Sequence, residues 1–170
     1  GHGDIAWSLE VLSRRVISWI THSDLILIDA EADDSNRFMR SLGRQLHLLE
    51  IQRREAAPGP TNLTALLALL LADLSIDARG NRLARTERAF LAELKAQVLP
   101  DGGHVSRNPV VVLDLILDLL PLRRCYIARE RSPPAELVST IDAMLAFLRA
   151  MRLGNGMLGC FNGAGVVAMD

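Results

Sequence analysis

The sequence is poor in cysteine, aromatic residues and lysine. Cys125 and Cys160 are its two cysteines, aromatic residues make up 4% of the 170 residues, and Tyr126 is the single tyrosine. Lys95 is the only lysine. Two cysteines make no disulfide framework and show no metal-ligand spacing. We therefore expect neither a disulfide-stabilised domain nor a metal centre, and both cysteines are interpreted as small hydrophobic residues.

Long apolar runs and catalytic signature motifs are also missing. The longest apolar run, residues 63–74, is interrupted by Asp73 and is shorter than the roughly 20 residues that a membrane span needs. The sequence contains no glycine-rich dinucleotide or phosphate-binding loop, no zinc-protease motif and no serine-hydrolase elbow. We therefore expect no transmembrane segment and no cofactor.

The charge is nearly balanced, with 19 basic and 20 acidic residues. A dedicated nucleic-acid-binding protein usually carries an excess of basic residues on one face. The balance therefore argues against a nucleic-acid partner and gives no support to a membrane-surface role.

What the sequence does contain is a series of helical patterns. Hydrophobic residues recur at steps of three and four, which is the spacing of one face of an α-helix. The segment 63–76 is apolar nearly all round and is predicted to be buried on most sides. The predicted helices span residues 4–20, 35–55, 63–76, 82–99, 110–120 and 132–152, and an extended segment follows at 157–162. This layout predicts an all-α fold of antiparallel helical hairpins, arranged as a bundle, a solenoid or a toroid.

One polar corner, residues 101–109, separates two of these helices and reads Asp-Gly-Gly-His-Val-Ser-Arg-Asn-Pro. Of the four histidines, only His104 stands among other polar groups that a loop could bring together. Asp114 and Asp118 lie one turn apart on the next helix, and could be an acid and base pair or two structural carboxylates. The residues of the corner do not by themselves identify a reaction.

The corner resembles one found in bacterial heparinase II/III-type polysaccharide lyases. In that family a phrase of the type Asp-Gly-Gly-His, two residues, Arg-Ser-Pro lies between two helices. Here Asp101 to His104 and Arg107-Asn-Pro109 match it. The segment 154–163 resembles a later stretch ending in Phe-Asn, and Trp7, Glu10, Arg14 and Arg15 fit an early Trp-Glu-Arg helix.

The resemblance implies an incomplete (α/α) toroid over residues 1–153. Residues 154–170 would then be an extended linker toward a missing C-terminal β-sandwich domain. The implied partner is an acidic, uronic-acid-containing polysaccharide, cleaved by β-elimination, and the implied location is the periplasm or cell envelope.

The resemblance also implies roles for individual residues. β-Elimination needs donors that neutralise the uronate carboxylate, and groups that accept and donate protons. His104 and Asn62 would be catalytic, and the substrate-binding residues would be Arg107, Asn108, Trp7 and Arg14. The family's catalytic tyrosine position is occupied by Val111. The resemblance also implies that a second catalytic histidine comes from the missing sheet domain, so we expect this chain alone to be inactive.

Two alternatives remain open at this stage. One is a non-catalytic glycan-binding or envelope-assembly protein with the same fold, which the Val111 position favours. The other is a helical interaction scaffold, which the low aromatic content favours because sugar rings commonly stack on flat aromatic faces.

Overall fold

The computed structural model describes residues 5–76, 81–153 and 157–159 of the chain. Within these residues the regular structure is helical, and β structure is limited to isolated bridges. None of the described helices is long and apolar enough to cross a membrane. The all-α prediction is therefore confirmed, whereas the toroidal arrangement is not. The elements are η1 (Ile5–Trp7), α1 (Leu9–Thr21), α2 (Ser23–Leu27), α3 (Ala32–Arg53), α4 (Pro60–Ser75), α5 (Asn81–Gln97), α6 (Pro109–Ala128) and α7 (Ala135–Met151).

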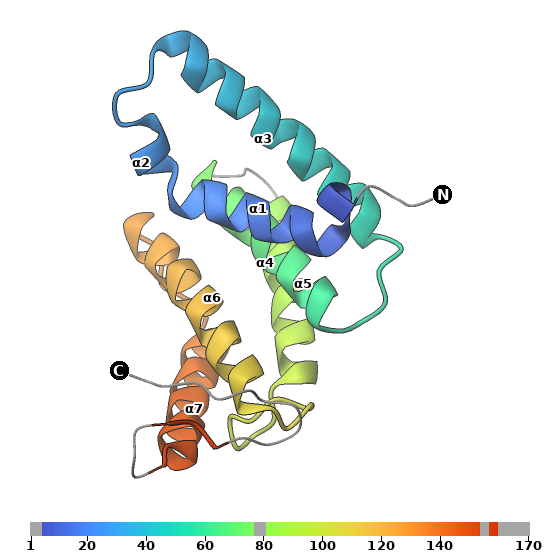
Figure 1. Cartoon of the computed structure of the whole chain (residues 1–170), viewed down its shortest axis with the longest axis vertical. Helices are drawn as coiled ribbons and strands as arrows, with labels where there is room; N and C mark the ends of the chain where they lie inside the picture. Colours follow the sequence, from blue (N-terminus) through green and yellow to red (C-terminus); the bar gives the residue numbers. More distant parts are fainter. Residues whose placement is uncertain (1–4, 77–80, 154–156, 160–170) are drawn as a thin grey trace. The chain divides into compact units, whose positions relative to one another are not determined.

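The chain divides into two compact units, Gly1–Glu93 and Leu94–Asp170. The boundary falls inside α5, the helix labelled α5 in Figure 1. The first three turns of this helix belong to the first unit and its end belongs to the second.

The first unit is built around α4. Twelve of the 16 residues of this helix are buried, namely Asn62, Leu63 and every residue from Ala65 to Leu74. Both α1 and α3 pack against α4 and against each other. α1 is capped by the preceding residue Ser8, whose hydroxyl accepts a hydrogen bond from the Val11 N–H. Each fully buried leucine contributes roughly 1.5–3 kcal/mol, so α4 supplies much of the hydrophobic stabilisation of this unit.

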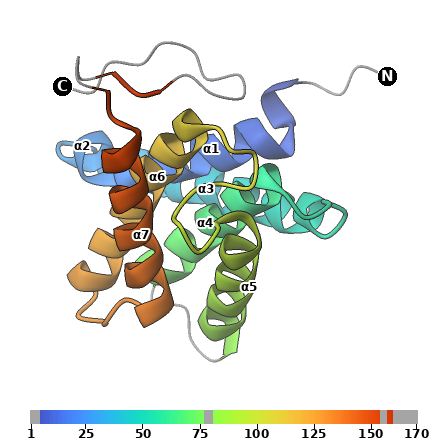
Figure 2. The ribbon, with the colours of Figure 1, turned by 90° about the horizontal axis from the view of Figure 1, so that it is seen from below.

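In the second unit, α6 and α7 pack side by side (Figure 2). The prediction that the helix starting at residue 110 ends before Pro121 is wrong, because α6 continues to Ala128. Proline removes one backbone hydrogen bond and costs about 3 kcal/mol in a helix interior. Leu122 and Tyr126, which are 0% and 2% exposed, lie beyond the proline, and their burial offsets that cost.

Other predicted boundaries shift by a few residues. α3 begins at Ala32 instead of residue 35, and the short apolar stretch near Leu25 forms the helix α2, for which no helix was predicted. The predicted extended segment 157–162 is described only as far as Gly159, where Leu158 forms an isolated antiparallel bridge with Arg152. Residues 160–162 and the starting residue Asp4 of the first predicted helix lie outside the described residues.

Candidate functional site

A pocket of about 400 Å³ lies between α3, α4 and the first turns of α5, entirely within the first unit. We call it the arginine pocket, because four guanidinium groups line it. This volume is within the range of ordinary ligand sites. The lining residues are Glu50, Arg53 and Arg54 from α3, Leu66 and Leu69 from α4, and Arg82, Arg85, Thr86 and Ala89 from α5.

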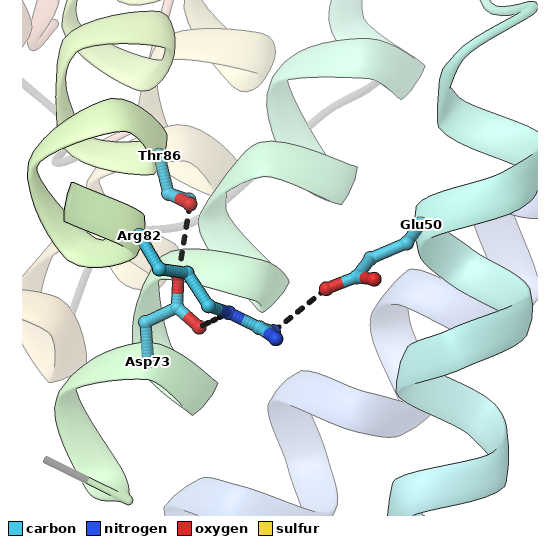
Figure 3. A network of polar contacts seen from close by, with 4 residues as sticks. All are labelled: Glu50, Asp73, Arg82 and Thr86. Carbon is cyan, nitrogen blue, oxygen red and sulfur yellow. Dashed lines mark hydrogen bonds and ion pairs between the residues drawn. The ribbon is translucent and has the colours of Figure 1, made fainter. Parts of the chain in front are cut away.

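In the wall of the pocket, Arg82 joins three helices (Figure 3). Its Nε lies 2.6 Å from Oδ1 of Asp73 on α4, and its Nη2 lies 2.7 Å from Oε1 of Glu50 on α3. Thr86, one turn further along α5, donates its hydroxyl to the other Asp73 oxygen at 2.8 Å. The Asp73 side chain is completely buried, so this carboxylate depends on Arg82 and Thr86 for its compensation.

The other three arginines of the pocket are not matched in this way. Among the described residues, the side chains of Arg53, Arg54 and Arg85 form no ion pair. The Arg53 Nε atom is buried and has no hydrogen-bond partner there. Of the four arginines, Arg82 alone forms ion pairs with carboxylates in the described part of the chain, those of Glu50 and Asp73. A buried N–H without a partner is uncommon in folded proteins, because leaving it unpaired costs about 1–3 kcal/mol.

The position of Arg85 adds to the positive potential. Both Arg82 and Arg85 lie in the first turns of α5, whose first turn contains no acidic residue. The start of a helix carries the positive end of its dipole, which disfavours cations and favours anions. The arrangement can thus hold a negatively charged group, with N–H donors coming from two helices.

The predicted polar corner folds in the second unit, where His104 is a buried, fully bonded residue. It is 4% exposed. The Ser106 backbone N–H donates to His104 Nδ1 at 3.1 Å, so Nδ1 carries a lone pair and the ring proton belongs on Nε2. Nε2 lies 3.3 Å from the Gln97 Oε1 acceptor. Burial lowers the pKa of His104.

Close packing explains the two glycines of the corner. Gly102 has a φ of +82°, and a Cβ added there would lie 2.1 Å from the backbone oxygen of Ala143 in α7. A Cβ on Gly103 would meet the Phe147 ring at 3.1 Å. The corner is therefore pressed against α7, and a side chain at Gly102 has no room.

The remaining polar groups of the corner bond to one another. Arg107 Nη1 donates to Asp101 Oδ2 at 3.0 Å, and the Gly103 N–H donates to Asp101 Oδ1 at 3.0 Å. The Gly103 N–H and the Arg107 guanidinium hold the pKa of the Asp101 carboxyl below its usual range. Asn108 is the N-cap of α6 and accepts from the Val110 N–H at 2.9 Å. The structure thus brings together His104, Arg107 and Asn108.

The other predicted site residues lie in the first unit. Asn62, on α4, donates to Glu93 Oε2 at 2.8 Å, and the Gly59 N–H donates to Glu93 Oε1 at 2.8 Å. Trp7 is 46% exposed, and its ring lies under the Arg15 guanidinium at 5.1 Å. Arg14 is exposed on α1.

Comparison with known proteins finds no matching family model and no matching solved structure. The chain is similar to FtsZ-localized protein C of Caulobacter vibrioides (strain NA1000 / CB15N), with 33% identity over 164 residues. The alignment covers 95% of this chain and 28% of that protein. The chain therefore spans less than a third of the length of this relative.

This similarity corrects the interpretation based on the polar corner. The resemblance to heparinase II/III-type lyases is wrong, and so is the predicted β-elimination of uronic-acid polysaccharide, because the similarity extends over nearly the whole chain and points to an FtsZ-localized protein. The predicted location in the periplasm or cell envelope is wrong on the same finding. The envelope-assembly alternative agrees with it better.

The residue roles inferred from the lyase resemblance have no test here. The catalytic roles of His104 and Asn62 stay predictions, as do the substrate-binding roles of Arg107, Asn108, Trp7 and Arg14. The division into residues 1–153 and 154–170, with a β-sandwich to follow, is also untested, and most of the second segment lies outside the described residues.

Sequence reasoning missed the arginine pocket. In the sequence, Arg53 and Arg54 are ordinary arginines of a predicted helix, and Asp73 stands out only as an interruption of an apolar run. That interruption was the usable signal, since an ionised side chain in a helix buried on all sides requires a partner from another element.

Proposed function

We propose that this chain is a helical protein-binding part of a larger protein that acts at FtsZ-containing structures of the cell-division site. The observation that carries the proposal is the 33% identity to FtsZ-localized protein C over 95% of this chain. Its partner is then a protein of the division apparatus, at the site where FtsZ lies, instead of a polysaccharide.

The geometry is consistent with a binding role. Among the described residues no group of three or more His, Cys, Asp or Glu side chains could hold a metal ion. The polar groups of the corner are bonded among themselves or cap α6, which suits a structural turn. The arginine pocket instead brings four guanidinium groups together on packed residues of three helices, and one of them, Arg53, has a buried Nε atom without a hydrogen-bond partner in the described part of the chain. A site on packed helices holds its side chains more firmly than a site on loops.

Two measurements test this proposal. A fluorescent fusion of the chain, produced in Caulobacter vibrioides with labelled FtsZ, is expected to give bands that coincide with FtsZ. Purified chain is expected to sediment with polymerised FtsZ, either directly or after addition of division-site extract. Diffuse fluorescence together with no sedimentation in either condition would contradict the proposal.

A control separates this segment from the rest of the relative. Deleting the stretch of FtsZ-localized protein C that aligns with this chain is expected to weaken its localization with FtsZ. Full localization of the shortened relative would assign the binding to its other 72% and overturn the proposal for this chain.

A further inference from the structure

We infer that the arginine pocket is a docking site for an acidic segment of a protein partner, with Asp or Glu carboxylates held by Arg53, Arg54 and Arg85. This inference rests on the proposed protein-binding function and specifies the surface and the chemistry of the partner.

The positive charge of the pocket favours a negatively charged partner. The pocket has four arginines, and the carboxylates beside them, Glu50 and Asp73, are both engaged by Arg82. The other three guanidinium groups have no ion-pair partner among the described residues. Arg54 and Arg85 are exposed and Arg53 is half-buried, yet all three line one cavity, which brings their charges together. Holding several cations together without a counter-charge is unfavourable, so the site favours an anion.

The placement of the arginines around the pocket suits carboxylate groups. Arg53 and Arg54 come from the end of α3, and Arg85 comes from the start of α5 on the other side of the pocket. Guanidinium groups bind carboxylates through two parallel N–H···O bonds. Because the Arg53 Nε atom is buried in the described part of the chain, a carboxylate at Arg53 would pair end-on with its two Nη atoms.

The apolar lining and the volume of the pocket favour a peptide over a small anion. Leu66 and Leu69, which are 2% and 5% exposed, form the base of the pocket with Ala89. Apolar groups at the base suit the methylene groups of Glu side chains and the peptide between them. A pocket of about 400 Å³ is larger than a single phosphate or carboxylate requires, and holds two or three residues of a chain.

The contacts of Arg82 with Glu50 and Asp73, together with the Thr86–Asp73 hydrogen bond, form a clamp that holds one wall of the pocket. Because Arg82 is fixed by Asp73 and Glu50, it cannot swing out to form a competing contact without leaving the buried Asp73 carboxylate unpaired. Arg53, Arg54 and Arg85 thus line a pocket whose wall is held in place, which lowers the entropy lost on binding.

The test is fluorescence anisotropy with the purified chain and a labelled eight-residue peptide of alternating Glu and Gly, at about 50 mM and about 300 mM salt. Arg53→Ala and Arg85→Ala are each expected to weaken binding about tenfold or more, as for loss of one charged hydrogen-bonded pair. Arg85→Lys should recover part of the affinity, because it keeps the charge without the paired donors. Binding should weaken at the higher salt concentration.

The matched control is Arg88→Ala. Arg88 is an exposed arginine on α5 that does not line the pocket, so its removal changes net charge equally and should leave affinity unchanged within about twofold. Thermal melts of every variant establish that the fold is retained. An equal loss in Arg88→Ala would indicate non-specific attraction and overturn the inference, as would no binding of the peptide at millimolar concentration.

Two further binding measurements identify which ligand the pocket holds. A Lys-Gly peptide of the same length must not bind. Inorganic phosphate must compete only at concentrations far above those of the Glu-Gly peptide. If phosphate competes equally well, the pocket is a site for small phosphate anions and the inference fails.

If the chain localizes with FtsZ but the pocket variants bind the peptide normally, the inference fails while the proposed function stands. Peptide binding without localization would leave the pocket as an acidic-peptide site and reject the proposed function.

Discussion

Replacing Arg82 with alanine is expected to destabilise the first unit by about 3 kcal/mol. Breaking a buried ion pair by removing one partner typically costs about 3–5 kcal/mol, because the remaining charge is buried without compensation. Here Asp73 is fully buried but the Arg82 side chain is 42% exposed, which places the cost at the lower end of that range. Loss of the more exposed contact with Glu50 adds at most about 1 kcal/mol.

The assay is urea unfolding followed by circular dichroism, with thermal melts as a second measurement. For a chain of this size, each kcal/mol lowers the melting temperature by roughly 2–4 °C, so Arg82→Ala should lower it by about 6–12 °C. In the Asp73→Asn background the same change should cost only about 1 kcal/mol, because no buried charge is then left behind. The double-mutant cycle therefore predicts a coupling energy of about 2 kcal/mol.

Two results would refute this reasoning. If Arg82→Ala costs less than about 1 kcal/mol, Asp73 is compensated by something other than the clamp. If its cost is the same in the Asp73→Asn background, the effect of Arg82 arises from helix propensity or packing and not from the charge. Glu50→Gln serves as the control for the exposed contact and should change stability by less than about 1 kcal/mol.

The remaining predictions concern the corner and its glycines. Gly102→Ala should destabilise the chain by more than 2 kcal/mol, because its positive φ costs about 1–2 kcal/mol and its Cβ would collide with the α7 backbone; Gly43→Ala, in helix α3 with nothing within 4 Å, should instead stabilise it by about 0.5–1 kcal/mol, and urea unfolding measures both. Burial lowers the pKa of His104 below its ordinary value of 6.5, so the unfolded state binds more protons as the pH falls through that value. The free energy of unfolding should therefore decrease on acidification from about pH 7, and His104→Gln should remove that part of the decrease; an unchanged pH profile would show that His104 is not responsible.

The helices were largely predictable because their signals are local. The apolar stripes and the proline and glycine boundaries placed five of the predicted helices to within a few residues of α1, α3, α4, α5 and α7. The exception was α6, where Pro121 predicted an end. Proline disfavours a helix by a fixed local cost, whereas the burial of Leu122 and Tyr126 depends on contacts made by the fold and cannot be read from neighbouring residues.

The site was less predictable because it depends on distant residues. Arg53 and Arg85 are separated by an entire buried helix in the sequence, and each taken alone is an ordinary arginine on a helix. Only the packing of α3 beside α4, and the clamp that joins both to α5, bring them to one pocket. The residues of the Gly-Gly-His corner, by contrast, are adjacent in the sequence, so they could be recognised as a motif.

The contrast between these two sites explains why the Gly-Gly-His corner led to an incorrect functional prediction. Gly102 is required where the corner approaches the α7 backbone, and the buried His104 ring is required to satisfy the Ser106 N–H. A tight turn between packed helices imposes these needs whether or not any substrate is present, so a short match to such a turn carries information about packing. The unmatched arginines are different, because no packing requirement of the described chain explains why three cations gather around one cavity. Groups that the fold leaves unsatisfied are therefore the better guide to what this chain binds.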